Sequence, residues 1–349
     1  MNPRSMLSGS YTVDPQSSVW LPKGASGQFS YSDGAEIEER LLKFVSSCKD
    51  RSCHSRELAH GIVDWPTRYH LGSERSNVLR PLRTALQGQV LELGAGCGAI
   101  SRCLGEFGAE VLAVEGSIAR ARVSAARCAD LPSVAVIADE IGALPDLGTF
   151  DCVLLIGVLE YSRRFPCPVG PRSSHIDPIQ RLLEYASSFL SAEGVLIVAI
   201  ENQLGLKYFA GAPEDHTGTA YVGIEDRYQS DSAVTFGRHE LKDRIASAGL
   251  SAQHFFYPLP DYKLPTIVLN DTFFAQDSPS AQLYDANDQQ PQRADRSFDE
   301  VKVWAPLLRN RVAQNFANSF LVCASRSALG PQWTRTEASF FDYRSAIAS

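Results

Sequence analysis

Three glycines that alternate along the chain, Gly94, Gly96 and Gly98, mark the segment best suited to chemistry. They directly follow an apolar stretch at residues 90–93 that is typical of a strand, and helical apolar spacing begins at residue 99. Glycines let a ligand approach the backbone, and the N-terminus of a helix offers unpaired N–H groups. This strand–glycine–helix corner predicts a nucleotide-binding site.

Acidic side chains accompany three successive predicted strands. Glu92 lies within the first strand, Glu115 ends the second, and Asp139 and Glu140 follow the third. Glu115 lies 21 positions beyond Gly94, where a carboxylate can accept hydrogen bonds from ribose hydroxyls. Because each strand end carries an acid, we expect the corner to hold a ligand rather than to be a buried turn.

Two cofactors fit this corner. Gly94, Gly96 and Ala99 match the relaxed dinucleotide pattern G-x-G-x-x-A, which is compatible with NAD. Three details favour S-adenosylmethionine instead. Glu92 can pair with the amino group of methionine, and a third glycine widens the arc open to a ligand. A carboxylate at Asp139–Glu140 can accept a hydrogen bond from adenine.

The composition restricts the possible partners. The 349-residue chain carries a formal net charge of -7, so nucleic acid is not expected as its main partner. The apolar runs around residues 153–159 and 195–200 are too short to span a bilayer, and no signal peptide is visible. We therefore expect a cytoplasmic protein without membrane insertion, either a monomer or a homodimer. Cys48, Cys53 and His54 lack a second pair of ligands, so we expect free thiols and no metal site.

Short apolar strands alternate with helical segments through the middle of the chain. The expected strands cover residues 89–93, 110–114, 134–137, 150–156, 194–200, 252–257 and 319–324, and the expected helices cover residues 100–107, 118–128, 177–190 and 240–248. This alternation is typical of a parallel sheet covered on both faces. Right-handed crossovers then lead to a doubly wound, Rossmann-like α/β fold.

The flanking sequence differs in composition from this core. We expect a flexible N-terminal arm (1–34), a helical lid or collar (35–86), the core (87–257), an insertion near the acceptor pocket (258–315), the last core strand (316–326) and a C-terminal tail (327–349). Two roles stay open for residues 35–86, which either close over the ligand or pack on the sheet edge.

Four segments together resemble the motifs of class I S-adenosylmethionine-dependent methyltransferases. They are VLELGAGCG at 90–98, VEGS at 114–117, the two acids at 139–140, and FDCVLLIGVLEY at 150–161. The resemblance implies a seven-stranded sheet of order 3-2-1-4-5-7-6 with the last strand antiparallel. The residues it assigns to S-adenosylmethionine are Glu92, Gly94, Gly96, Cys97, Gly98, Glu115, Gly116, Ser117, Asp139, Glu140, Ile156 and Val158.

A narrower resemblance points to a bacterial subgroup associated with polysaccharide and natural-product pathways. It covers residues 69–71 with 75–77, 200–208, 212–218, and 257–258 with 260–265. It implies the reaction type more closely than the identity of the acceptor.

The segments that follow strands five and six should face the acceptor, since ligands lie beyond the carboxyl ends of the strands in open α/β sheets. A neutral imidazole suits a general base near pH 7, which favours His216, with Glu201 to orient it and Tyr208 beside them. The alternatives are a loop histidine bonded to backbone and a glutamate that caps the next helix. The candidates for binding the acceptor are Tyr69, His70, Arg75, Tyr161, Asn202, Tyr221, Tyr257, Asp261 and Tyr262.

We therefore expect a methyltransferase that moves a methyl group from S-adenosylmethionine to a small-molecule or glycan-linked acceptor. O-methylation requires removal of a proton, whereas S-methylation of a methionine-like thioether requires only a pocket that stabilises the emerging cation. The alternatives are an NAD-dependent oxidoreductase and a non-catalytic protein that binds S-adenosylmethionine.

Overall fold

The computed structural model of this chain describes residues 3–24, 34–165, 177–275, 296–334 and 340–343. In these residues, a mixed sheet of eleven strands has the order β1-β2-β5-β4-β3-β6-β7-β10-β8-β9-β11. The strands are β1 (Tyr11–Val13), β2 (Trp20–Pro22), β3 (Gln89–Leu93), β4 (Glu110–Glu115), β5 (Val134–Ala138), β6 (Phe150–Ile156), β7 (Leu190–Glu201), β8 (Ala252–Leu259), β9 (Ile267–Asn270), β10 (Ser319–Ser325) and β11 (Phe340–Asp342).

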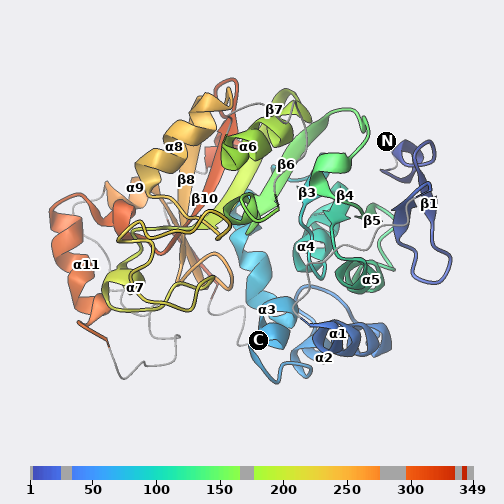
Figure 1. Ribbon diagram of the computed structural model, residues 1–349, viewed down its shortest axis with the longest axis horizontal. Coiled ribbons are helices and arrows are strands. Elements are labelled where there is room, and N and C mark those ends of the chain that lie inside the picture. Colours follow the sequence, from blue (N-terminus) through green and yellow to red (C-terminus); the bar gives the residue numbers. More distant parts are fainter. Residues whose placement is uncertain (1–2, 25–33, 166–176, 276–295, 335–339, 344–349) are drawn as a thin grey trace.

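Helices connect the strands and cover the sheet (Figure 1). The α-helices are α1 (Ala35–Ser47), α2 (Arg56–Ala59), α3 (Trp65–Leu71), α4 (Ala99–Phe107), α5 (Ile118–Arg127), α6 (Pro178–Ser188), α7 (Leu206–Phe209), α8 (Arg238–Ser247), α9 (Asp271–Phe274), α11 (Glu300–Arg309) and α12 (Pro331–Thr334). Short 3-10 helices are η1 (Pro3–Met6), η2 (Ser73–Val78), η3 (Arg80–Leu82), η4 (Ile141–Ala143), η5 (Leu159–Tyr161) and η7 (Ala313–Phe316). Among the described residues, no helix combines the length and the apolar character needed to cross a bilayer.

Side chains of the central strands alternate between two separate cores. Leu91 and Leu93 of β3 belong to the core that also contains residues of α6 and α8, whereas Val90 belongs to the core that contains residues of α4 and α5. Because both faces are covered, the central strands carry apolar residues continuously, as the sequence indicates. The doubly wound α/β architecture therefore follows from the pattern of the chain (Figure 1).

The expectation of seven strands is wrong, because four short strands extend the sheet beyond the core. The hairpin of β1 and β2 pairs with β5 at one edge, and β9 and β11 extend the other edge beyond β8. Between them, the strands run β5-β4-β3-β6-β7-β10-β8, with β10 antiparallel to both of its neighbours. The added strands have three or four residues each, too few for their apolar periodicity to be recognised.

Residues 3–24 belong to the sheet instead of forming the flexible arm that we expected. Leu7 and Tyr11 are buried in the same core as Leu112. The hydroxyl of Tyr11 donates a hydrogen bond of 2.7 Å to Asp139, at the end of β5. The buried side chains of Leu7 and Tyr11 anchor this segment to the core. The sequence analysis did not recognise them, because the segment as a whole has a polar composition.

Residues 35–82 form a helical collar, packed on α5. Leu41 and Val45 of α1 share a small core with Val123 of α5. Glu38 of α1 and Arg120 of α5 form a buried ion pair at 3.2 Å. The collar therefore packs on the helical layer of the core, and its later part reaches the carboxyl edge of the sheet.

The region after β8, which we expected to be an insertion, first continues the sheet, and residues 276–295 of this expected insertion lie outside the described residues. β8 turns at residues 260–266 into β9, which pairs antiparallel with it. Trp304 of α11 is buried in a separate small cluster with Leu206 of α7. Within the tail, β11 pairs with β9, so the tail also takes part in the sheet.

We expect the substitution Leu7→Ala to lower the free energy of unfolding by about 2–5 kcal/mol, since it removes a fully buried side chain. The matched control Val13→Ala, in the adjoining strand β1 but 48% exposed, should change it by less than about 0.5 kcal/mol. Urea unfolding followed by tryptophan fluorescence measures both. Equal midpoints for Leu7→Ala and the wild type would contradict the inclusion of residues 3–24 in the cooperative fold.

Candidate active site

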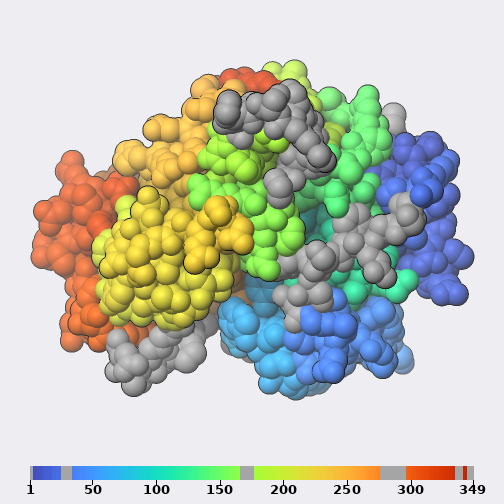
Figure 2. All heavy atoms as spheres, viewed as in Figure 1, coloured from blue at the N-terminus to red at the C-terminus, as the bar shows by residue number. Residues whose placement is uncertain are grey.

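A cavity of about 1040 Å³ lies at the carboxyl ends of β3, β4 and β6. The glycine corner forms its floor, and the other walls come from α3 and η2 of the collar, from residues 212–216, and from residues 260–264. In Figure 2, the collar (blue) and the segment after β7 (yellow) lie on the same face of the molecule. Three regions that are distant in sequence therefore enclose one site.

The backbone at the glycine corner has the conformation that the alternating glycines predict. Gly94 and Gly96 have φ angles of 83° and 56°, in the left-handed region that favours glycine. A Cβ atom on Gly94 would lie 2.5 Å from Val158 Cγ2, whereas one on Gly96 would meet nothing within 4 Å. Gly96 therefore leaves open space beside the cavity.

Gly98 has a different role from the one expected. It does not line the cavity but precedes α4, with a φ angle of 77°. A Cβ atom there would lie 2.5 Å from the Oγ atom of Ser124 and 2.7 Å from its Cα atom. The third glycine therefore allows α4 to pack closely on α5.

Glu92 is the most deeply buried acid at the floor of the cavity. Its carboxylate accepts a hydrogen bond of 2.6 Å from the hydroxyl of Ser101, and 2% of the residue is exposed. Burial raises its pKa to about 8, although Ser101 and the positive charge of Arg75 act in the opposite direction. An unliganded Glu92 is therefore largely protonated at neutral pH and has one carboxyl oxygen left for a ligand.

Glu115 organises the turn after β4. One carboxylate oxygen accepts a hydrogen bond of 2.7 Å from the N–H of Gly96, and the other accepts one of 2.9 Å from the N–H of Ser117. Burial raises the pKa of Glu115, and these backbone N–H groups partly offset that effect. Ser117 caps α5 and does not line the cavity, whereas Glu115 and Gly116 do.

Of the two acids expected beside adenine, Glu140 lines the cavity and Asp139 does not. Asp139 does not line the cavity, because its carboxylate accepts hydrogen bonds from the hydroxyl of Tyr11 and from the N–H of Glu140. Glu140 is exposed and lines the cavity, followed by Ile141 and Gly142. The other expected cofactor residues that line it are Cys97, Ile156 and Val158.

Arg75 joins the collar to the segment after β8. Its guanidinium lies 4.8 Å from the ring centroid of Tyr69 and 5.6 Å from that of Tyr262. It donates hydrogen bonds of 3.1 Å and 3.3 Å to the carbonyl oxygens of Tyr262 and Lys263. These contacts between two rings hold both walls of the cavity together.

His216 lies between a tyrosine hydroxyl and a glutamate. Its Nδ1 atom is 2.9 Å from the hydroxyl oxygen of Tyr161, and its Nε2 atom is 3.4 Å from a carboxylate oxygen of Glu201. Burial opposes protonation of the imidazole, but the carboxylates of Glu201 and Glu160 raise the pKa of His216. His216, the expected base, and Tyr161, expected only to bind the acceptor, both line the cavity, and the pairing between them was not predicted.

Glu201 is fully buried behind His216, among cations that the sequence analysis did not select. Lys263 donates a hydrogen bond to Glu201, and a second one of 2.6 Å to Asp215. Lys207 lies 3.0 Å from Asp215 and 3.7 Å from Asp261. Burial works against the charge on Glu201, but Lys263, His216 and Lys207 together hold its pKa well below its usual range.

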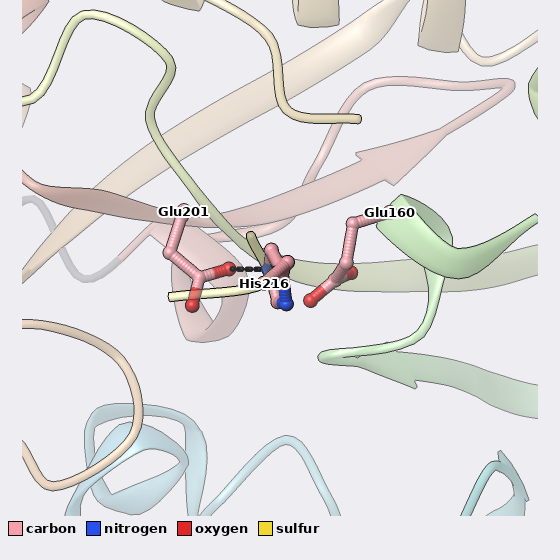
Figure 3. A group of neighbouring side chains, drawn as sticks. All are labelled: Glu160, Glu201 and His216. Carbon is pink, nitrogen blue, oxygen red and sulfur yellow. Dashed lines mark hydrogen bonds and ion pairs between the residues drawn. The ribbon is translucent and has the colours of Figure 1, made fainter. Parts of the chain in front are cut away.

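Glu160, in η5, lies on the side of His216 opposite Glu201 (Figure 3). This residue is fully buried, and one of its oxygens accepts a hydrogen bond of 3.2 Å from the hydroxyl of Tyr262. Burial and the neighbouring Glu201 raise the pKa of Glu160 to about 7. The sequence analysis did not select Glu160, which is an isolated acid in an apolar motif.

Five expected acceptor or catalytic residues do not line the cavity: Glu201, whose contacts are described above, and Tyr257, Asn202, Tyr208 and Tyr221. Tyr257 bonds through its hydroxyl to Asp271 and Arg238. Asn202 donates to the carbonyl oxygens of residues 315 and 317 at 2.8 Å and 2.7 Å. Tyr208 is buried beneath the ammonium of Lys207, which lies 4.9 Å from its ring centroid, and Tyr221 is in an exposed turn with a φ angle of 65°.

The remaining expected acceptor residues, Tyr69, His70, Arg75, Tyr161, Asp261 and Tyr262, all line the cavity. The lining also includes Lys207, Asp215 and Lys263, which were not selected, and Trp65, Arg164 and Phe165. The charged motif around 212–218 and 260–263 was a signal for the lysine–aspartate network, but pairing between these segments is not evident from spacing alone.

Comparisons with known proteins find remote structural similarity only. No family model matches the sequence, and no curated protein matches it. The CcbJ methyltransferase from Streptomyces caelestis aligns with a TM-score of 0.43 and 16% identity, covering 80% of this chain and 100% of that protein. A methyltransferase from Thermotoga maritima, described as a possible histamine N-methyltransferase, aligns with a TM-score of 0.39 and 17% identity, covering 73% and 91% of the two chains.

A third solved structure is an S-adenosylmethionine-dependent methyltransferase from Clostridium acetobutylicum. It aligns with a TM-score of 0.40 and 10% identity, covering 78% of this chain and 96% of that protein. All three scores are low and all three identities are under 25%.

We expect Gly98→Ala to lower the free energy of unfolding by at least about 1–3 kcal/mol, because alanine is strained at this φ angle and its Cβ would overlap Ser124. The matched control Gly116→Ala adds a Cβ that meets nothing within 4 Å and should change stability by less than about 0.5 kcal/mol. Urea unfolding of both variants measures the difference. A stable Gly98→Ala protein that has lost cofactor binding would instead support a direct role for Gly98 in ligand approach.

Proposed function

We propose that this protein is an S-adenosylmethionine-dependent methyltransferase that acts on a hydroxyl group of a small-molecule or glycan-linked acceptor. The observation that carries the proposal is a single cavity with the glycine corner and Glu92 at its floor and the Tyr161–His216 pair in its wall. The cavity therefore combines a suitable cofactor site with a base.

The cofactor half of the cavity suits S-adenosylmethionine in three places. Glu92 offers a buried carboxylate oxygen to the amino group of the methionine part. Glu115 lines the cavity where ribose hydroxyls would lie, and Glu140 lines it where adenine would lie. NAD is less suited, because its pyrophosphate carries no cationic group that could pair with Glu92.

The acceptor half suits removal of a proton. In methyl transfer, the acceptor oxygen attacks the methyl carbon, the carbon–sulfur bond breaks, and S-adenosylhomocysteine leaves. The proton from the acceptor hydroxyl passes to His216, directly or through the hydroxyl of Tyr161, while Glu201 stabilises the imidazolium that forms. Lys263 keeps Glu201 ionised for this purpose.

O-methylation is favoured over S-methylation of a thioether. A thioether needs ring faces that stabilise a cation. Tyr208, Tyr221 and Tyr257, which suggested such a pocket, do not line the cavity. Tyr161 and Tyr262 do line it, but their hydroxyls contact His216 and Glu160, as expected of residues that support a base. The contact between Tyr161 and His216 also argues against a non-catalytic role, since binding the cofactor alone requires no histidine between a tyrosine and a carboxylate.

The affinity for S-adenosylhomocysteine should rise with pH by roughly tenfold per unit between pH 6 and 7, and level off near pH 8. The sign follows from the pKa of about 8 for Glu92 in the free protein. Only the ionised carboxylate pairs with the ligand's ammonium, so below this pKa each binding event must first release a proton. Isothermal titration calorimetry measures the profile, and Glu92→Gln should bind more weakly with a flat profile. Binding of NAD without S-adenosylhomocysteine would contradict the proposed function.

We expect His216→Ala to lower kcat by roughly 100- to 10,000-fold, because it removes the base, while the Kd for S-adenosylhomocysteine stays unchanged. The matched control His239→Ala, at an exposed position on α8, should retain full turnover. A screen of hydroxylated acceptors with S-adenosylmethionine labelled in its methyl group supplies the assay. Unchanged turnover in His216→Ala would exclude this histidine as the base and favour an acceptor that loses no proton.

A further inference from the structure

Glu160, Glu201 and His216 come from three separate segments and converge on one point behind the wall of the cavity. One oxygen of each carboxylate and one imidazole nitrogen all lie within 4.8 Å of one another. Both glutamates are fully buried. Figure 3 shows the two carboxyl groups directed toward the imidazole from opposite sides.

Each member of this cluster is held from the outside by a different partner. The hydroxyl of Tyr262 donates to Glu160 Oε1 at 3.2 Å, and Lys263 donates to Glu201 Oε1. The hydroxyl of Tyr161 lies 2.9 Å from His216 Nδ1. Outer partners of this kind orient the ligands of metal ions in proteins.

The atoms on the inner side of the cluster are much less satisfied. Glu160 Oε2 is buried and has no hydrogen-bond partner among the described residues. Glu201 Oε2 and His216 Nε2 face each other at 3.4 Å, near the limit for a hydrogen bond. A buried carboxylate oxygen without a partner destabilises a protein, so the arrangement calls for a cation or a proton at this point.

We propose that Glu160, Glu201 and His216 form a binding site for a divalent transition-metal ion, with Zn²⁺ as the best fit. Two carboxylate oxygens and one imidazole nitrogen are a donor set that Zn²⁺ accepts, with a fourth position left for water or a ligand. Lys263 does not prevent binding, because it contacts the outer oxygen of Glu201 and is also paired with Asp215 at 2.6 Å.

His216 cannot bind the metal ion and accept a proton from the acceptor at the same time. A metal ion on Nε2 leaves the remaining proton of the neutral imidazole on Nδ1, which can then donate to Tyr161 but cannot accept a proton from it. This inference rests on the proposed function and adds to it a metal-bound state in which His216 cannot act as the base. Metal binding itself is measured without methyl donor or acceptor, so its failure and the failure of the proposed function are distinguishable.

The test is titration of the full-length protein, freed of metal by a chelator, with Zn²⁺ in a calorimeter and with Co²⁺ in a spectrophotometer. We expect one high-affinity equivalent and a visible Co²⁺ spectrum without the near-ultraviolet band of cobalt–thiolate bonds, which excludes the cysteines as ligands. Glu160→Gln keeps the shape of the side chain and removes its charge. It should weaken binding by at least roughly 100-fold, since even outer partners of metal ligands contribute about 10- to 100-fold.

The matched control Glu184→Gln, at an exposed position on α6, should bind Zn²⁺ like the wild type. Thermal unfolding without metal serves to check that Glu160→Gln is folded. Three results would overturn the inference: no saturable binding by the wild type, a Co²⁺ spectrum with thiolate bands, or undiminished binding by Glu160→Gln. The first result, together with a Glu160→Gln protein at least as stable as the wild type, would assign the cluster to a protonated Glu160.

Discussion

The central strands are buried on both faces of the sheet, so polar chemistry can occur only where these strands end. Glu92 and Glu201 lie in β3 and β7 at that edge of the sheet, and both residues are buried. A buried carboxylate requires hydrogen bonds, a cation or a proton. Much of the architecture around the cavity supplies these partners.

The surroundings of Glu92 and Glu201 shift the pKa values of these two acids in opposite directions. Glu92 is paired with the neutral hydroxyl of Ser101, and burial raises its pKa. Glu201 is paired with Lys263 and His216, which keep it ionised against the effect of burial. In the proposed methyltransferase, Glu92 pairs with a cation only when the ligand binds. Glu201 is already paired with cations and can orient the base, His216.

These pairings also explain why distant segments meet at the cavity. Lys263 follows β8, yet it contacts the end of β7 and the loop that carries Asp215 and His216. Arg75 links the collar to the same segment after β8 through carbonyl oxygens and two aromatic rings. The walls of the site are therefore joined by charge pairing and cation–π contacts, in addition to the apolar core beneath them.

Features encoded over short distances could be predicted from the sequence. The apolar strands, the helices between them and the φ-positive turn at Gly94 and Gly96 are local, since periodicity and glycine conformation depend on neighbouring residues. The order of the segments then indicated that residues after β7 and β8 face the site, which the positions of His216 and Tyr262 match. The hairpin at residues 3–24 was not predicted, because its anchoring depends on a few buried side chains in a polar stretch.

By itself, then, the sequence determined the α/β layers, the glycine corner and the edge of the sheet that carries polar side chains, because these depend on local conformation and apolar periodicity. Only the tertiary structure decided which polar side chains face the cavity. Asp139 turns away because Tyr11, 128 positions earlier, supplies its hydrogen bond. Glu160 joins His216 and Glu201 because three separate segments bring their charges together, and the pairing of buried charges over such separations leaves no periodic signal in the chain.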